Sequence, residues 1–138
     1  MSELEQKQHV WTIGDYSIVG DWFTQASRRC LDVMDVRGLR VLDVACGTGA
    51  VAIEAARRGA HVHGVDLTPA MLAVAKQRAE RAGVDVAWHQ GSFDDLSAFR
   101  DFDLVTSAFG VIFADDQPAV AKQLVETVKP GGVVSLTA

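Results

Sequence analysis

Two glycines and an aspartate stand where short apolar runs of the sequence end. Gly47 and Gly49 follow the run 40–45, and Asp66 follows the run 60–65. Glycine lacks a Cβ atom and therefore permits both a tight turn and the close approach of a ligand to the backbone. A carboxylate at the end of the next strand can accept hydrogen bonds from both hydroxyls of a ribose. This combination indicates a site for a ligand that contains a nucleoside.

A second aspartate, Asp43, lies inside an apolar run, where a charged side chain is costly unless donors surround it. Backbone N–H groups of the following loop would supply such donors, and the carboxylate would then hold the turn in shape. The same carboxylate would also suit an ammonium group on a ligand. The sequence leaves the structural role and the binding role open.

Alternating strands and helices are predicted along the part of the chain that must position these residues. Apolar runs predict strands at 40–45, 60–65, 84–89, 102–107 and 133–137, with a turn at 130–132 before the last. Intervening segments predict helices at 51–58, 69–82 and from 115 or 116 to about 128. Thr68 stands at the N-cap of the second of these helices, and Gly83 ends it. The stretch 89–101 has at most a short helix and is not assigned further.

Strands joined by helical crossovers predict parallel pairing, because such crossovers are right-handed. We therefore expect an α/β fold: a Rossmann-like, doubly wound sheet of five parallel strands in the order 3-2-1-4-5, with helices on both faces. The 138 residues suit a single domain. Residues 1–37 form a helical N-terminal segment in this interpretation, with an apolar stripe over 15–34, and 38–138 form the core.

Ligands bind such a sheet at the carboxyl ends of its strands, beside the switch point. The third predicted strand leads into Gly91–Asp94, and the fourth ends at Ser107–Gly110. Four strand ends therefore converge on one crevice.

Several segments resemble the motifs of class I S-adenosylmethionine-dependent methyltransferases. They are Val41–Gly49 (the glycine-rich first motif), Val65–Leu72 (the acidic second motif), Gly91–Leu96 (the third), Phe102–Ser107 (the fourth strand) and Leu124–Gly132 (the turn before the fifth strand). The resemblance runs from about residue 38 to the C-terminus. Gly14–Tyr16 and Phe109–Ala114 are similar to a small-molecule subgroup whose substrates are mostly unassigned.

The resemblance implies S-adenosyl-L-methionine as the cofactor and methyl transfer to a small-molecule acceptor by in-line displacement, in which alignment of the reactants is the main contribution. The cofactor-binding residues that it implies are Tyr16, Asp43, Ala45, Gly47, Gly49, Asp66, Leu67, Met71, Ser92, Phe93, Ser107 and Ala108. Asp66 would hold the ribose, Ser92 and Phe93 would meet the adenine, and Ser107 and Ala108 would line the methyl-donor end. No side chain stands out as a general base, so no catalytic residue is named, and no metal site is expected.

Two positions depart from the family pattern. Ala45 stands where many members have glycine, and we expect this change to cost little. Ser92 stands where an aspartate usually reads the adenine amino group. A serine hydroxyl can accept that hydrogen bond, but without charge and with a shorter reach.

The resemblance also bears on the C-terminal end of the sheet. Family members continue past the fifth strand with an antiparallel hairpin, which we expect this sheet to lack, so that the chain would be a truncated piece of a longer enzyme. Strand 133–137 would then be an exposed edge, and exposed edges pair with other chains. We expect a homodimer through these residues.

Composition narrows the function classes. The formal net charge is −5 and 49% of the residues are hydrophobic. An acidic chain repels phosphate backbones, so nucleic-acid binding is disfavoured. No run reaches the roughly 18 apolar residues of a membrane span, and a cytoplasmic protein without a membrane partner is expected.

Two alternatives remain open at this point. Gly47–Ala52 also fits the G-x-G-x-x-A pattern of an NAD(P)-binding oxidoreductase domain, and Asp66 stands close to the spacing that such a domain requires. A non-catalytic fragment that binds cofactor without turnover has the same fold and ligand as the first interpretation, and differs only in activity.

Overall fold

Five parallel strands form the centre of the computed structural model, which describes residues 1–12 and 24–137. The strands are β1 (Arg40–Val44), β2 (His61–Asp66), β3 (Ala87–Gln90), β4 (Phe102–Ala108) and β5 (Val128–Thr137). Their order in the sheet is β3-β2-β1-β4-β5, and every neighbouring pair is parallel. The predicted strand order is confirmed.

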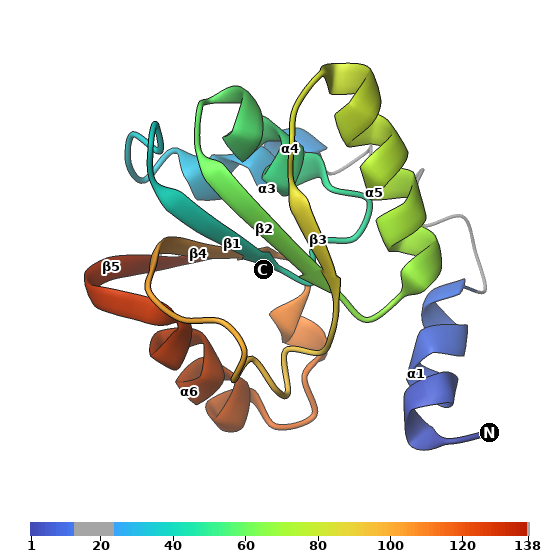
Figure 1. Cartoon of the computed structure of the whole chain (residues 1–138). Coiled ribbons are helices and arrows are strands. Elements are labelled where there is room, and N and C mark those ends of the chain that lie inside the picture. Colours follow the sequence, from blue (N-terminus) through green and yellow to red (C-terminus); the bar gives the residue numbers. More distant parts are fainter. Residues whose placement is uncertain (13–23, 138) are drawn as a thin grey trace.

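Helices cover both faces of this sheet. They are α1 (Glu3–Thr12), α3 (Thr24–Arg28), α4 (Ala50–Arg57), α5 (Pro69–Ala82) and α6 (Gln117–Thr127), with short 3-10 turns η1 (Arg29–Leu31) and η2 (Val111–Phe113). Figure 1 shows α3, α4 and α5 on one side of the sheet and α6 on the other. Within the described residues, no helix is long and apolar enough to cross a membrane.

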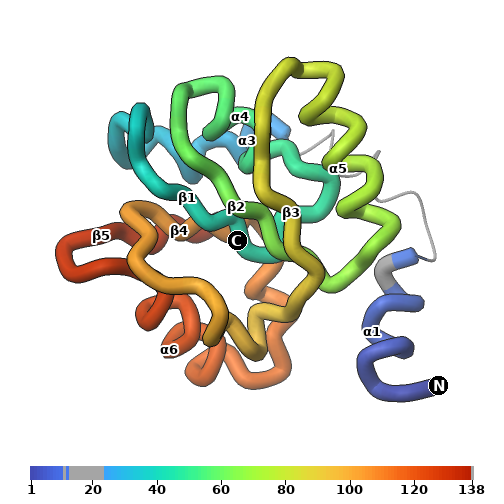
Figure 2. Tube along the Cα trace, in the orientation of Figure 1, coloured from blue at the N-terminus to red at the C-terminus, as the bar shows by residue number. Residues whose placement is uncertain are grey.

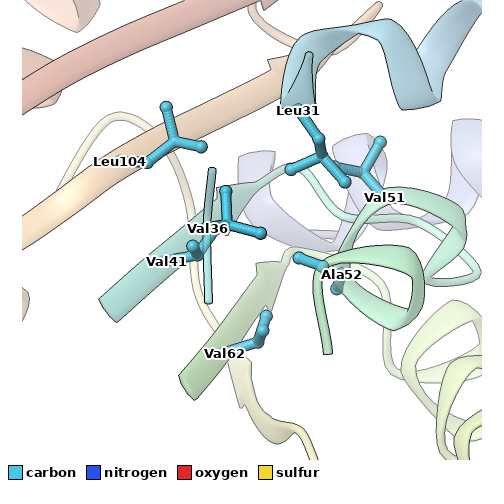
Figure 3. Packing of buried hydrophobic residues seen from close by; sticks show 8 residues of the cluster. Leu31, Val36, Val41, Val51, Ala52, Val62 and Leu104 are labelled. Carbon is cyan, nitrogen blue, oxygen red and sulfur yellow. The ribbon is translucent and has the colours of Figure 1, made fainter. Parts of the chain in front are cut away.

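A core cluster lies on each face of the sheet because successive residues of a strand point to opposite sides. On the α4 side, Val41 and Val62 pack with Leu31, Val51 and Leu104 (Figure 3). A second cluster contains Leu42, Val44, Val65, Leu96, Phe102, Val105, Val120 and Leu124. Burial on both faces explains why the central strands read as near-continuous apolar runs.

The connection from β3 to β4, which the sequence left unassigned, is held by a buried leucine. Leu96 is fully buried, and its backbone N–H donates to Gln123 Oε1 of α6 at 2.9 Å. The tube in Figure 2 shows this connection running past α6 before it enters β4. Phe93 and Phe99 pack against the same core cluster, so three apolar residues and one hydrogen bond to α6 hold the segment in place.

Strand β5 differs from its prediction at its start. The turn expected at 130–132 lies inside the strand, because Val128 already pairs with Phe102 while Val133 pairs with Leu104. The extra residues form an irregularity in the pairing, where Gly131 adopts a φ of +82°. The Pro-Gly-Gly sequence therefore interrupts the strand without preceding it.

The described parts of the N-terminal segment are helical at Glu3–Thr12, Thr24–Arg28 and Arg29–Leu31, and turns follow before β1. The apolar stripe expected over 15–34 lies partly outside the described residues. In its described part, helical structure ends at Leu31, three residues before Met34. Helix α1 reaches back to the sheet through Gln8, whose Nε2 donates to the Leu67 carbonyl at 3.0 Å.

Gly49 shapes the turn from β1 into α4. Its φ is +91°, and a Cβ atom at this position would lie 2.9 Å from Trp88 Cη2 and 3.1 Å from Ala75 Cβ. Backbone conformation and packing against α5 and β3 therefore both require glycine.

We predict that Gly49→Ala lowers the free energy of unfolding by about 3 kcal/mol, since a left-handed backbone costs about 1–2 kcal/mol and overpacking costs about 1–3 kcal/mol. Gly83→Ala is the matched control, because Gly83 has a φ of +71° with open space around it. It should lose only about 1 kcal/mol in the same urea titration. Equal losses would contradict the packing argument.

Candidate functional site

A cleft of about 580 Å³, here called the strand-end cleft, opens at the carboxyl ends of the central strands. Its volume lies within the roughly 300–1,000 Å³ of small-molecule sites. The residues predicted from the sequence that line it are Asp43, Ala45, Gly47, Asp66, Leu67, Met71, Ser92, Phe93 and Ala108. The topology thus brings the ends of β1, β2 and β4 and the segment after β3 together, as expected for a doubly wound sheet.

Two predicted site residues are absent from the described lining. Gly49 faces Trp88, Ala75 and Ile53 on the protein side of the turn. Ser107 is fully buried, and its hydroxyl donates to the Val44 carbonyl at 2.8 Å. Tyr16 lies outside the described residues. Gly49 and Ser107 therefore shape the walls behind the cleft without reaching it.

Asp66 ends β2 and is 8% exposed. One carboxylate oxygen accepts the Gly47 N–H at 2.8 Å, and the other accepts the Thr68 N–H at 2.9 Å. Burial raises the pKa of Asp66, and the hydrogen bonds from Thr68 and Gly47 oppose that rise. The carboxylate is therefore fixed in orientation beside the glycine-rich loop.

Thr68 acts differently from its prediction as a capping residue. It occupies the N-cap position of α5 with extended dihedral angles, but its side chain makes no capping hydrogen bond. Its backbone N–H goes to Asp66 instead. The start of α5 is thus tied to the acid of the cleft.

Asp43, in β1, also lines the cleft and is 2% exposed. Its carboxylate accepts the hydroxyl of Thr106, on β4, at 2.8 Å. Burial raises the pKa of Asp43 to about 7, with the Asp66 charge adding to the rise and Thr106 opposing it. The main donor that this buried carboxylate requires is therefore the Thr106 hydroxyl of β4, whereas the sequence predicted N–H groups of the loop after β1.

Helix α1 supplies cleft residues that sequence reasoning missed. Lys7 and Val10 line the cleft, and Lys7 Nζ lies 3.2 Å from Asp115 Oδ2 and 3.9 Å from Asp94 Oδ2. The hydrogen bond that Lys7 donates to Asp115 raises the pKa of Lys7. A polar surface helix carries no sequence signal for such contacts, since Asp94 and Asp115 lie 87 and 108 residues farther along the chain.

The segment after β4 extends the cleft lining beyond the strand end, 107–110, that the sequence predicted to reach the crevice. Phe109, Gly110, Ile112 and Phe113 all border the cleft, and Ile112 and Phe113 are largely exposed. The resemblance of 109–114 to a small-molecule subgroup was the available signal. Exposed apolar groups at a cleft mouth suit an apolar ligand.

Ala45 is strained, contrary to the expectation that alanine costs little there. Its φ is +56°, a region that costs a residue with a Cβ atom roughly 1–2 kcal/mol. Gly110 packs directly against it, because a Cβ atom on Gly110 would overlap the Ala45 Cβ. The loops after β1 and β4 therefore meet at this pair.

A family model described as "Methyltransferase domain" matches residues 41–132, which include β1 to β4 and most of the cleft lining. The chain belongs to this methyltransferase domain family. The membership predicted from the sequence is confirmed, and the family is not the NAD(P)-dependent oxidoreductase alternative that the glycine spacing left open.

Individual relatives agree with this assignment. The uncharacterised Mycobacterium tuberculosis protein Rv1403c is 37% identical over 131 residues, which cover 93% of this chain and 48% of the relative. Nocamycin O-methyltransferase of Saccharothrix syringae is 37% identical, over 90% of this chain and 47% of the relative. A solved TehB-like SAM-dependent methyltransferase from Corynebacterium glutamicum superposes with a TM-score of 0.70 at 25% identity, over 96% of this chain and 71% of that one. The chain spans about half the length of the curated relatives it matches.

We predict that Asp43→Asn changes how stability depends on pH. The folded pKa of Asp43 lies above its unfolded value, so between about pH 4 and 7 the native state holds a proton that the unfolded state has lost. The contribution of Asp43 to stability therefore falls as pH rises through that window. Asparagine keeps an acceptor for Thr106 without this loss.

Urea denaturation of both proteins at pH 5 and pH 7.5 measures the effect. The unfolding free energy of Asp43→Asn relative to the parent should rise by about 1 kcal/mol or more between these pH values. Asp85→Asn, a matched change at an exposed position, should show no comparable rise. If the difference in unfolding free energy between Asp43→Asn and the parent is the same at both pH values, the raised pKa of Asp43 is wrong.

We predict that Gly110→Ala and Ala45→Gly are coupled. Gly110→Ala alone should cost about 1–3 kcal/mol of unfolding free energy through overlap with Ala45. In the double variant, Ala45→Gly removes the methyl group that the new Cβ atom at position 110 would overlap. The loss of unfolding free energy should therefore be about 1 kcal/mol smaller than the sum of the two single losses. Additive losses in the urea titrations would show that the two loops do not pack as described.

Proposed function

We propose that the protein transfers the methyl group of S-adenosyl-L-methionine to a small-molecule acceptor. The observation that carries the proposal is the Asp66 carboxylate, held by Gly47 and Thr68 in the cleft of a methyltransferase-family chain. Each of its oxygens accepts one of these hydrogen bonds, and a carboxylate oxygen can accept about two. A free acceptor position on each oxygen suits the two hydroxyls of a ribose.

The other lining residues fit the remaining parts of such a cofactor. Leu67 and Met71 offer an apolar surface for a flat base, and Ser92 with Phe93 borders the same end. Asp43 provides a second carboxylate for the positive charges of the amino acid part. When bound, the cofactor supplies an activated methyl group, and the chain has to align the acceptor with it and exclude water.

We further propose an uncharged or weakly acidic acceptor that reacts through oxygen. The exposed apolar side chains of Ile112, Phe113 and Val10 stand at the cleft mouth and favour an apolar molecule. The named O-methyltransferase among the relatives supports oxygen as the acceptor atom. Among the described lining residues there is no histidine, so a phenol or enol, which ionises readily, fits better than an alcohol.

We predict that the chain binds S-adenosylhomocysteine, and that Asp66→Asn weakens this binding about tenfold or more. The reason is that hydrogen bonds to a charged group contribute about 1.5–3 kcal/mol. Calorimetric titration of the purified chain measures the affinity, with NAD and NADP run alongside. Asp95→Asn is the matched control, because Asp95 is exposed and outside the cleft lining.

Each result of that titration decides something. Binding of NAD or NADP in place of S-adenosylhomocysteine, or equal binding by Asp66→Asn, would overturn the proposed site. A second assay incubates the chain with S-adenosylmethionine and a panel of phenols and enols and measures the S-adenosylhomocysteine formed. Cofactor binding without formation of S-adenosylhomocysteine would favour the non-catalytic alternative.

We also propose that the protein forms a homodimer through residues 133–137. Strand β5 ends the described sheet, pairing there with β4, and its Leu136 is 50% exposed. An open strand edge with an apolar side chain favours pairing with a second copy. Sedimentation equilibrium should show a dimer that Leu136→Lys weakens, and a monomer at high concentration would contradict it.

A cytoplasmic location is proposed with the function, supported by two buried free cysteines.

A further inference from the structure

A second pocket, of about 280 Å³, lies between α3, α4 and α5. It is lined by Arg28 of α3, Arg57 of α4, and Arg78 and Arg81 of α5, and we call it the arginine pocket. These helices lie on the same side of the sheet in Figure 1. The pocket adjoins the strand-end cleft, since Arg78 Nη1 donates to Thr48 Oγ1 at 3.2 Å and Thr48 lines the cleft.

Among the described residues, a single carboxylate lies near two of these arginines. Glu54 is the carboxylate near Arg28 and Arg57, at 3.7 and 3.8 Å, and it also lies 3.4 Å from Arg58. Glu54 therefore lies near three guanidinium groups, of which Arg58 also pairs with Asp32 at 3.0 Å. Arg81 makes no hydrogen bond or ion pair with any residue in the part of the chain that the structure describes.

Arg28 adds an independent observation. Its Nε is buried and has no hydrogen-bond partner among the described residues, because 3.7 Å to Glu54 exceeds a hydrogen-bond distance. Buried polar groups are normally paired, so each exception requires an explanation. Because this atom has almost no accessible surface, it marks a guanidinium group that the described residues pair incompletely, and any contact with a ligand falls to the other nitrogens of the pocket.

We propose that the arginine pocket is a second ligand site, which binds the phosphate or diphosphate group of a small ligand. Guanidinium groups bind phosphate oxygens in bidentate pairs, and four of them line this one pocket. The pocket has the volume of about nine water molecules, which is enough for a diphosphate. Ile53 and Ala82 provide an apolar floor against which the arginine stems and the ligand pack.

The overall charge of the chain does not explain such a site. The protein carries a formal net charge of −5, so anions in bulk solution are repelled on average. Binding of an anion would therefore be a local property of these four side chains, and single substitutions should remove it.

Pyrophosphate is the probe for the test, titrated calorimetrically into the chain without cofactor at about 50 mM salt, where screening is modest. Arg57→Gln and Arg81→Gln should each weaken binding about tenfold or more. Glutamine keeps helix propensity, and thermal melts of each variant confirm folding. Arg29→Gln is the matched control, since Arg29 is exposed, adjoins Arg28 and does not line the pocket.

Arg81→Lys refines this test because lysine keeps the charge but loses the planar fork. Its affinity should lie between those of the parent and Arg81→Gln. The proposal is overturned if the parent does not bind pyrophosphate, if the pocket variants bind it as the parent does, or if Arg29→Gln loses as much as they do. These titrations use no S-adenosyl compound, so their outcome is independent of the proposed methyl transfer.

Two further probes identify the source of the phosphate group. Ribose 5-phosphate binding more tightly than inorganic phosphate, with the same arginine dependence, would assign the site to a phosphorylated organic ligand. Equal binding would assign it to the free anion, and both results support the proposal. A single-stranded oligonucleotide that binds more tightly than either, through the same arginines, would replace it with a nucleic-acid interface.

Discussion

The hydrogen bond from the Gly47 N–H to the Asp66 carboxylate joins the ends of β1 and β2, the strands beside the switch point of the sheet. The other oxygen of the same carboxylate holds the N–H of Thr68, where α5 begins. One buried acid thus fixes the loop before α4, the end of β2 and the start of α5. The shape of the strand-end cleft depends on this acid, which explains why a costly carboxylate is kept at 8% exposure.

Asp43 and Asp66 together give the cleft its electrostatic character. Both are buried, and the charge of Asp66 contributes to the raised pKa of Asp43. A ligand that brings positive charge relieves this repulsion, whereas an anionic ligand increases it. The arginine pocket on the other side of the Thr48–Arg78 contact has the opposite character. Two adjoining pockets of opposite charge fit two chemically different ligands.

Much of the fold followed from patterns in the sequence. Apolar runs of strand length, with Gly and Pro between them, predicted the strand order, because right-handed crossovers leave few alternatives. The glycine-rich turn and Asp66 predicted where the cleft lies, since both belong to local motifs. Gly49 was assigned to the ligand, whereas its φ and its neighbours show a packing role. Ligand approach and close packing both require glycine, and the packing at Gly49 comes from Trp88 and Ala75, which lie far along the chain.

Contacts between distant segments escaped prediction for the same reason. Lys7 reaches Asp115, and Leu96 is held by Gln123, without any periodicity to mark them. The strain at Ala45 depends on a backbone angle that a single residue type does not reveal. The arginines of the second pocket come from three helices, so only the tertiary structure brings them together.

A crystal structure of the chain with S-adenosylhomocysteine would test the central claim most directly. The account predicts the ligand in the strand-end cleft, with both ribose hydroxyls at hydrogen-bond distance from the Asp66 carboxylate and with the Gly47 N–H still bound to it. A ribose held by other residues, or a ligand outside this cleft, would contradict it.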